Sequence, residues 1–207
     1  MEKHYSKKTF VKELWPAQHL IGQFNILKGE SSVTKIPTSA GKTKASEMII
    51  RSAFLSGRTQ LAIIVAPFRA LCHEITNDLH TAFNGENVRI NELSDIFEID
   101  MSTENIFDQT QIMVITPEKL LYVLNYHKEV VANAGLFIFD EGHQFDNDAR
   151  GITYELLLTT ILMYISPGVQ KILMSAVIKN AKEIGAWLDE RANIVSGSNL
   201  MPTFRSV

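Results

Sequence analysis

The sequence predicts an α/β domain with a mainly parallel β-sheet and helices on both of its faces. Along most of the 207 residues, short segments rich in β-branched residues alternate with segments of helical periodicity. Such alternation is typical of strand–helix–strand units, whose right-handed crossovers place helices over a parallel sheet. In addition, residues 61–66 (LAIIVA) are apolar at every position, as expected of a strand that is covered on both faces.

Each element has its own local signal. The first helix is predicted at residues 16–27, because Pro16 suits a first helical turn and Gly29 suits a C-terminal stop. A second helix begins near Lys42 and ends at Gly57, and apolar residues at helical spacing predict a third that stops before Gly85. Further helices are predicted at residues 117–125, 151–165 and 180–188, and strands at residues 33–36, 61–66, 112–116, 136–140 and 171–175.

One segment interrupts this alternation of predicted strands and helices. Residues 86–108 carry seven acidic side chains and a single arginine, Arg89. We interpret the segment as a solvated strand-and-loop excursion at one edge of the sheet. The alternative is an acidic metal or partner site, but no carboxylate spacing there resembles a cation-binding loop.

Composition excludes several classes of protein. The chain is 45% hydrophobic, enough for one well-buried domain, and its net charge of −3 provides no basic field for nucleic acid, so any phosphate contact must be local. The single cysteine, Cys72, excludes an intrachain disulfide framework and suits a reducing, cytoplasmic compartment. The most apolar stretch, residues 152–165, is shorter than the roughly 20 residues of a membrane span and contains Glu155. A soluble protein without a membrane partner is expected.

The segment IPTSAGKT, at residues 36–43, follows the first predicted strand and has the composition of a phosphate-binding loop. The ammonium group of Lys42 can neutralise the β and γ phosphates of a nucleotide, and the Thr43 hydroxyl can ligate Mg²⁺. A GKT sequence after an apolar strand rarely serves another purpose. The backbone N–H groups that can surround a phosphate belong to Thr38, Ser39, Ala40 and Gly41.

A second motif, FDEGH at residues 139–143, stands where another apolar strand ends. Asp140 can hold the same Mg²⁺ through its water shell, and Glu141 can polarise the attacking water, which makes both residues, with Lys42, the predicted catalytic group. Alternatively, the two acids could start a helix, favoured by its dipole. That explanation is weaker because the preceding apolar residues place both at the carboxyl edge of the sheet, where parallel sheets bind their ligands.

Taken in order, the motifs resemble the first RecA-like lobe of a superfamily 2 helicase, most closely the Ski-like DExH branch. WPAQ at residues 15–18 resembles the adenine-reading segment of that family, and PTSAGKT resembles its phosphate loop. APFRAL at residues 66–71 and ITPEKL at residues 115–120 resemble its nucleic-acid-contacting motifs. FDEGH and the segment at residues 174–188 resemble its metal-binding and coupling motifs. The resemblance spans nearly the whole chain and implies a RecA-like P-loop domain.

This resemblance implies a motor lobe that binds ATP with Mg²⁺ and hydrolyses ATP to translocate along or unwind nucleic acid. Gln18 would hydrogen-bond the adenine. Arg69 and the Thr116–Pro117 turn would contact the backbone of single-stranded or partly duplex DNA or RNA, without reading its sequence. The residues that would couple hydrolysis to strand movement are His143, Ser175 and Ala176.

Each of these roles has a simpler alternative. Gln18 could be a solvated residue on an amphipathic helix, and Arg69 a surface charge at a helix start. Thr116 and Pro117 could be an N-cap and a first-turn proline. His143 could be a metal ligand, although no other histidine has a suitable spacing. No aromatic cluster accompanies Arg69 in the sequence, so base stacking is not expected.

The chain also departs from the family pattern. Ile36 stands where such loops have a small residue, and Val177 stands where the coupling motif often has a threonine. No arginine finger of a second lobe is recognisable before the final segment MPTFRSV. A single lobe is therefore expected over residues 1–207, acting with a second RecA-like lobe that is absent from it. The alternatives are a non-motor, ATP-dependent switch or partner-binding module and, more weakly, another P-loop enzyme such as a small kinase.

Overall fold

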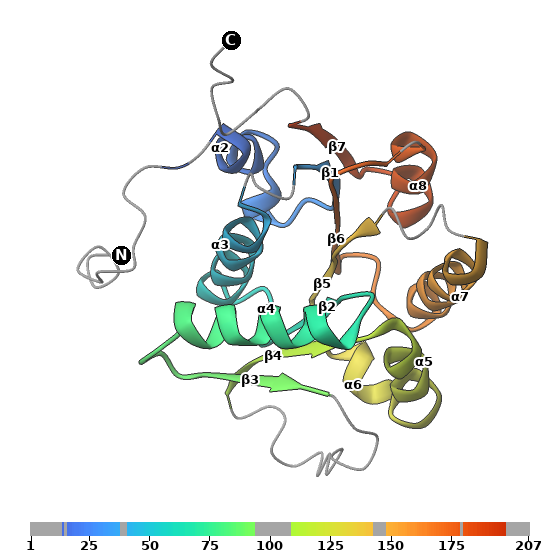
Figure 1. Ribbon diagram of the computed structural model, residues 1–207, viewed down its shortest axis with the longest axis horizontal. Helices are drawn as coiled ribbons and strands as arrows, with labels where there is room; N and C mark the ends of the chain where they lie inside the picture. Colours follow the sequence, from blue (N-terminus) through green and yellow to red (C-terminus); the bar gives the residue numbers. More distant parts are fainter. Residues whose placement is uncertain are drawn as a thin grey trace.

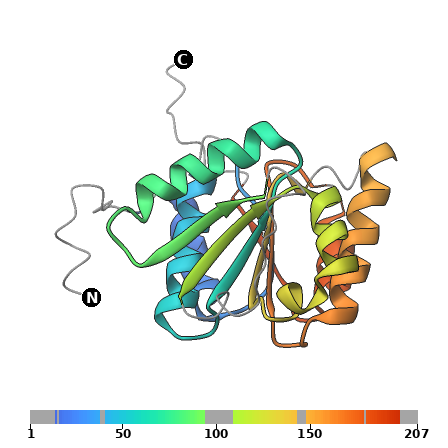
Figure 2. The same ribbon diagram turned by 90° about the horizontal axis from the view of Figure 1, so that it is seen from below.

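The molecule has three layers, in which a central sheet lies between two groups of helices (Figures 1 and 2). The computed structural model describes residue 14 and residues 16–37, 41–93, 109–142, 148–178 and 180–197. The seven strands of the sheet all pair in parallel, in the order β3-β4-β2-β5-β6-β1-β7. The predicted α/β class, with a parallel sheet covered on both faces, is confirmed.

The strands agree with the predicted segments and include one further strand that was not predicted. The predicted strands are observed as β1 (Ser32–Lys35), β2 (Leu61–Val65), β4 (Thr110–Ile115), β5 (Leu136–Phe139) and β6 (Gln170–Ser175). The two edges of the sheet are formed by β3 (Val88–Glu92), which lies in the acidic segment, and by β7 (Asn193–Ser196), which was not predicted. β3 confirms the strand excursion predicted at one edge, while residues 94–108 of that acidic segment lie outside the described residues.

The helices also follow the predicted order, with two differences. They are α2 (Pro16–Gln23), η1 (Ile26–Lys28), α3 (Lys42–Leu55), α4 (Arg69–Ala82), α5 (Pro117–Tyr126), α6 (Lys128–Ala132), α7 (Asp148–Tyr164) and α8 (Ala181–Leu188). The continuous helix predicted at residues 16–27 is wrong, because Asn25 adopts a left-handed backbone with φ 57° and separates α2 from η1. The short α6 was not predicted, since five residues give too little periodicity to recognise.

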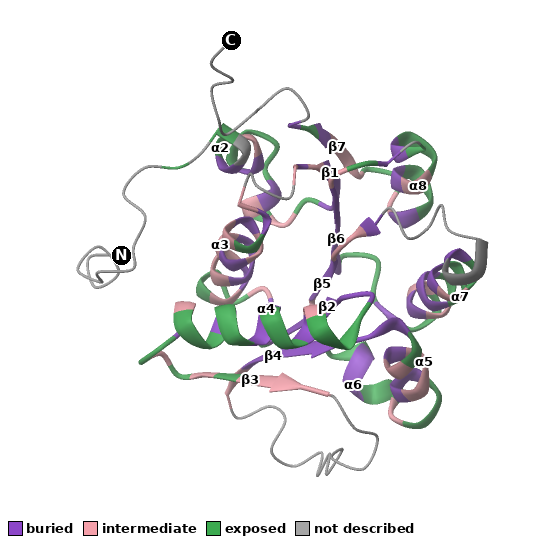
Figure 3. Ribbon diagram, in the orientation of Figure 1, coloured by how far each residue is buried: buried purple, intermediate pink, exposed green. Residues whose placement is uncertain are grey.

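Two hydrophobic cores lie on the two faces of the sheet, and β2 contributes to both. Leu61, Ile63 and Val65 pack in the core beneath α5, α6, α7 and α8. Ala62 and Ile64 pack in the opposite core, beneath α2, α3 and α4. Successive side chains of a strand point to opposite faces, so a strand covered on both sides must be apolar at every position. Figure 3 shows the resulting pattern, with buried positions along the sheet and exposed positions on the outer sides of the helices.

The strand order determines where functional side chains can meet. β6 lies between β1 and β5, and Lys35 at the end of β1 is in register with Ser175 at the end of β6. Because all strands are parallel, the segments that follow β1, β5 and β6 emerge together at the carboxyl edge of the sheet. None of the described helices is long and apolar enough to cross a membrane.

Candidate active site

The phosphate-loop segment leads from β1 into α3. The N–H of Ile36 donates to the carbonyl of Ser175 at 2.9 Å, which ties the end of β1 to β6. Gly41 has a left-handed backbone with φ 82° and immediately precedes α3, so Lys42 is the first residue of that helix. A glycine tolerates this conformation at no steric cost, and the helix N-terminus that follows presents unpaired N–H groups to an anion. Thr38, Ser39 and Ala40 lie outside the described residues.

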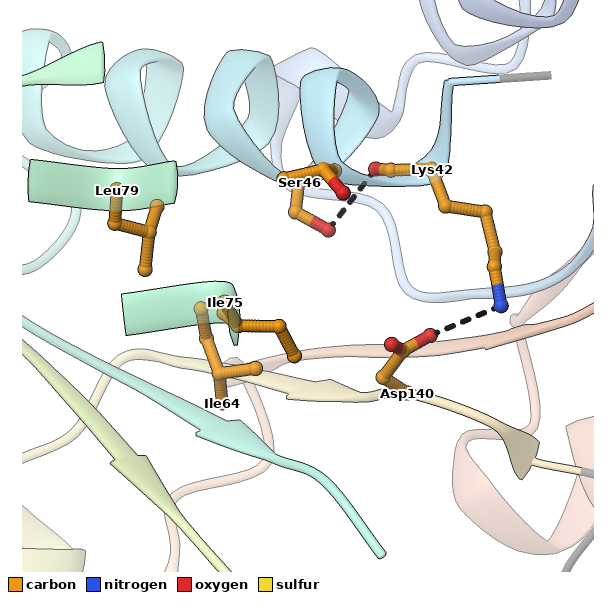
Figure 4. Close-up of a pocket in the computed structure, with 7 residues that line it drawn as sticks. Lys42, Ser46, Ile64, Ile75, Leu79 and Asp140 are labelled. Atoms are coloured by element: carbon orange, nitrogen blue, oxygen red, sulfur yellow. Dashed lines mark hydrogen bonds and ion pairs between the residues drawn. The ribbon is translucent and has the colours of Figure 1, made fainter. Parts of the chain in front are cut away.

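The fold brings Lys42 together with both predicted acidic residues, and Figure 4 shows its contact with Asp140. Lys42 Nζ lies 3.4 Å from Asp140 Oδ1 and also forms an ion pair with Glu141 Oε1. Asp140 is positioned by its backbone, because its N–H donates to the carbonyl of Val65 at 2.9 Å. Lys42 is only 8% exposed, so its ammonium group is held inside the site and depends on these carboxylates for charge neutralisation.

The electrostatics of Asp140 suit a cation-binding carboxylate. Burial raises the pKa of Asp140, and the neighbouring charge of Glu141 acts in the same direction. Lys42 and the N–H of Glu141, which donates to Asp140 Oδ1 at 2.9 Å, oppose the rise in pKa. A positive charge delivered beside Asp140 would therefore relieve an unfavourable concentration of negative charge.

The residues present fit a bound Mg²⁺ that is only partly coordinated by protein. Thr43, Ser46 and Asp140 line one small pocket, which extends inward from Lys42 toward Ile64 and Ile75 (Figure 4). Among the described residues, no three His, Cys, Asp or Glu side chains gather as a metal-binding group. Mg²⁺ commonly keeps several waters and binds through one or two protein ligands together with substrate phosphates, so this sparse donor set is suitable.

Two features of the acidic turn were not predicted from the sequence. Glu141 has φ 54°, a left-handed conformation that is uncommon outside glycine. The neighbouring Gly142 packs so tightly that a Cβ at this position would lie 2.7 Å from Cγ of Leu173, which is fully buried. Gly142 is therefore needed to let the acidic turn lie against the sheet. Its position directly after the acidic pair was the only signal in the sequence.

Gln18 and Ser175 are both buried, in contrast to Ala176. Gln18 is 3% exposed, so the alternative of a solvated polar residue on α2 is wrong. Ser175 is fully buried at the end of β6, where its hydroxyl donates to the carbonyl of Val177 at 2.9 Å. Ala176 is half-buried in the following turn, and His143 lies outside the described residues.

A separate groove brings together Arg69 and Thr116, two of the three residues predicted to contact nucleic acid. Arg69 at the start of α4 and Thr116 before α5 line the same groove, which also has two aromatic side chains, Phe68 and Tyr122, in its wall. No aromatic cluster was expected beside Arg69 from the sequence, and the groove instead brings Phe68 and Tyr122 into one wall. Thr116 is the N-cap residue of α5 and Pro117 is its first residue, which agrees with the simpler alternative, although the Thr116 hydroxyl makes no capping hydrogen bond.

Comparisons with known proteins agree with this architecture. The family model for the DEAD/DEAH box helicase matches residues 18–184. The chain belongs to the DEAD/DEAH box helicase family. As a helicase-type ATP-binding domain of that family, it has the RecA-like fold that its motifs predicted.

Several relatives and solved structures are similar to this helicase domain. The Hachiman protein HamB of Bacillus cereus is 29% identical over 185 residues, which is 89% of this chain and 16% of HamB. The ATP-dependent DNA helicase Hel308 of Thermoplasma acidophilum is 30% identical over 165 residues, 79% of this chain and 23% of Hel308. The chain thus spans less than a quarter of either relative's length.

Among solved structures, Mycobacterium smegmatis helicase Lhr bound to ssDNA and AMP-PNP has a TM-score of 0.70 at 21% identity, covering 89% of this chain and 26% of Lhr. The crystal structure of the DUF1998 helicase MrfA has a TM-score of 0.69 at 20% identity, covering 94% of this chain and 32% of MrfA. At such identities the likeness concerns the fold alone.

Proposed function

We propose that this chain is the first RecA-like motor lobe of an ATP-hydrolysing helicase of the Ski-like DExH branch, working with a second RecA-like lobe. The observation that supports the proposal is the contact of Lys42 with Asp140 and Glu141, which are the proposed phosphate-binding cation, metal-binding carboxylate and base. These three residues come from segments almost a hundred positions apart, with separations of 98 and 99 residues.

Each residue has a distinct role in the proposed hydrolysis. Lys42 exchanges its carboxylate partners for the β and γ phosphates of ATP, which lowers their charge. Thr43 and Asp140 hold Mg²⁺, and the ion, when bound, would neutralise charge that develops on the phosphates. Glu141 orients a water in line with the γ-phosphorus and accepts its proton, while the bond from that phosphorus to the ADP oxygen breaks. Gln18 hydrogen-bonds the adenine from α2.

The nucleic-acid partner is proposed to lie along the groove beside Arg69. This side chain is exposed and forms no hydrogen bond or ion pair with any described residue, so it is available for a phosphate. Thr116 lines the same groove at the N-terminus of α5, of which Pro117 is the first residue. Hel308 of Thermoplasma acidophilum carries the name DNA helicase, so a DNA strand is the first partner to test, with RNA beside it.

Coupling between the ATP site and the groove beside Arg69 is proposed to run through β6. Ser175 accepts a hydrogen bond from Ile36 at the phosphate loop, and the same strand pairs with β5, which carries Asp140 at its end. Ala176 and His143 would extend this connection toward the second lobe. For the free thiol of Cys72, which is buried, a reducing cytoplasmic compartment remains our proposal.

The test compares two neighbouring lysines of α3. Lys42→Ala should weaken Mg·ATP binding by at least about tenfold, since a charged hydrogen bond contributes roughly 1.5–3 kcal/mol. Lys44→Ala is the matched control, because Lys44 pairs with Glu47 at 2.6 Å on the same helix and should leave binding unchanged. Titration calorimetry on the unmutated chain and both variants measures the difference. Equal affinities for the two variants would remove the nucleotide from this site.

A further inference from the structure

Two aromatic rings line the groove that contains Arg69. We call this groove, lined by Pro67, Phe68, Arg69, Thr116, Lys119 and Tyr122 together with Glu118, the Phe68 groove. It opens at the carboxyl ends of the adjacent strands β2 and β4, where α4 and α5 begin. Phe68 is 45% exposed, which is a large exposure for phenylalanine, and it lies in the turn between β2 and α4.

Both rings lie outside the main packing of the domain. Neither Phe68 nor Tyr122 belongs to the two hydrophobic cores on the faces of the sheet. Tyr122 instead lies against Tyr126, one turn further along α5, with ring centroids 4.4 Å apart, and Tyr126 is 66% exposed. Aromatic surface therefore continues from the groove along the outer side of α5. Exposed aromatic surface of this kind commonly marks a binding site.

The charges around the rings select the kind of ligand. Arg69 and Lys119 contribute two cations to the groove and Glu118 one carboxylate. Lys119 is oriented by donating to the carbonyl of Leu93 at 3.1 Å, while Arg69 has no partner among the described residues. The positive ends of α4 and α5 add to this potential. A ligand that fits has anionic groups along one side and flat apolar groups along the other, which describes single-stranded nucleic acid.

We propose that Phe68, with Tyr122 in the same wall, stacks against bases of the strand whose phosphates contact Arg69. The inference rests on the proposed function and adds to it that the lobe binds the strand by its bases as well as by its backbone. Every base has a flat face, so the stacking tolerates any sequence. Bases within a duplex already stack on one another, so this site favours single-stranded nucleic acid over duplex.

The experiment separates base contacts from backbone contacts. Fluorescence anisotropy at low salt measures binding of a labelled deoxythymidine strand of roughly 12 nucleotides, within the range covered by known single-strand sites, and of an abasic strand of equal length. A uridine strand provides the RNA arm. The variants are Phe68→Ala and Arg69→Ala. Phe24→Ala is the matched control, because Phe24 is 37% exposed and does not line the groove.

The expected result is a loss that depends on the presence of bases. Phe68→Ala should weaken binding of the base-bearing strands by about tenfold and of the abasic strand by less than about twofold, as base–aromatic stacking does elsewhere. Arg69→Ala should weaken binding of all strands, and Phe24→Ala of none. A Phe68→Trp variant adds a direct signal, since its fluorescence should be quenched by base-bearing strands more than that of the unmutated chain, whose own tryptophans are Trp15 and Trp187.

Three other outcomes would overturn the inference, and they differ in what else they affect. If Phe68→Ala leaves strand binding unchanged while Arg69→Ala weakens it, base stacking is refuted and the proposed function stands. If Phe68→Ala weakens base-bearing and abasic strands equally, Phe68 shapes the turn and does not stack. If the unmutated chain binds neither kind of strand at low salt, both the stacking and the nucleic-acid part of the proposed function fail.

Discussion

The contact between Lys42 and Glu141 predicts an unusual effect of replacing Glu141 by glutamine. Without nucleotide, both carboxylates pair with the Lys42 ammonium group that would bind the ATP phosphates. The side chains of Lys42 and Glu141 are only 9% and 16% exposed, so their ion pair is partly buried. Glutamine keeps the shape but removes the charge, so it weakens this competition and removes a repulsion toward the phosphates. A partly buried ion pair contributes about 1 kcal/mol, which corresponds to roughly fivefold in affinity. Glu141→Gln should therefore bind Mg·ATP about fivefold more tightly while losing turnover.

Two assays decide this prediction. Titration calorimetry with a non-hydrolysable ATP analogue and Mg²⁺, at constant ionic strength, gives the affinity of the unmutated chain and of Glu141→Gln. Phosphate release, measured in a form that contains both lobes, gives turnover, where loss of a general base costs about 10²–10⁴ in rate. Asp140→Asn is the companion variant, because it should weaken binding only when Mg²⁺ is present. An affinity of Glu141→Gln that is tenfold weaker than that of the unmutated chain would show that Glu141 holds Lys42 ready for ATP and does not compete for it.

Three further predictions concern other parts of the molecule. Gln18→Ala should reduce a preference for ATP over GTP, and equal affinities for both nucleotides in the unmutated chain would exclude Gln18 from base recognition. Asp189→Asn should lower the free energy of unfolding by about 2 kcal/mol near neutral pH, because Lys171, which is 4% exposed, loses a carboxylate 3.3 Å away. Burial raises the pKa of Asp189, but the N–H of Arg191 and the charge of Lys171 outweigh it and leave the pKa below its usual value. The stabilisation is therefore complete above about pH 4 and is lost as the pH falls through the lowered pKa, which urea unfolding at several pH values measures. Finally, the purified 207-residue chain should hydrolyse ATP very slowly, with little stimulation by single-stranded DNA or RNA and no unwinding, since an arginine supplied across the cleft contributes about 10³–10⁵ in rate. Brisk, stimulated turnover in a steady-state assay would mean that two chains complete each other's sites.

The parts of the fold that could be predicted are those set by strong local patterns. The apolar run in β2 required cover on both faces, and the parallel strands that this implies bring Lys42 and Asp140 to one edge. β7 was missed because its sequence, NIVS, is short and lies at an edge where half-burial blurs the alternation. The break at Asn25 was missed because a left-handed residue leaves no periodic signal.

Only the site residues that belong to recognisable sequence motifs could be predicted. The residues of the phosphate loop and the acidic turn follow directly from their types and order. The burial of Gln18 and the meeting of Phe68 with Tyr122 depend on how α2, α4 and α5 pack, which sequence spacing alone does not determine. The tight contact of Gly142 with Leu173 is likewise a property of two distant segments.

The left-handed backbone at Glu141 sets stability and activity against each other at one position. Holding a residue with a side chain at φ 54° costs about 1–2 kcal/mol, a cost that glycine avoids and asparagine reduces. Either replacement would also remove the negative charge that disfavours ionised Asp140, at the loss of one ion pair. A library of variants at this position, selected only for resistance to heat, would therefore enrich glycine and asparagine. The same variants would lack the carboxylate proposed to activate water. Selection for heat resistance would therefore yield variants that stay folded but have lost the proposed hydrolytic activity.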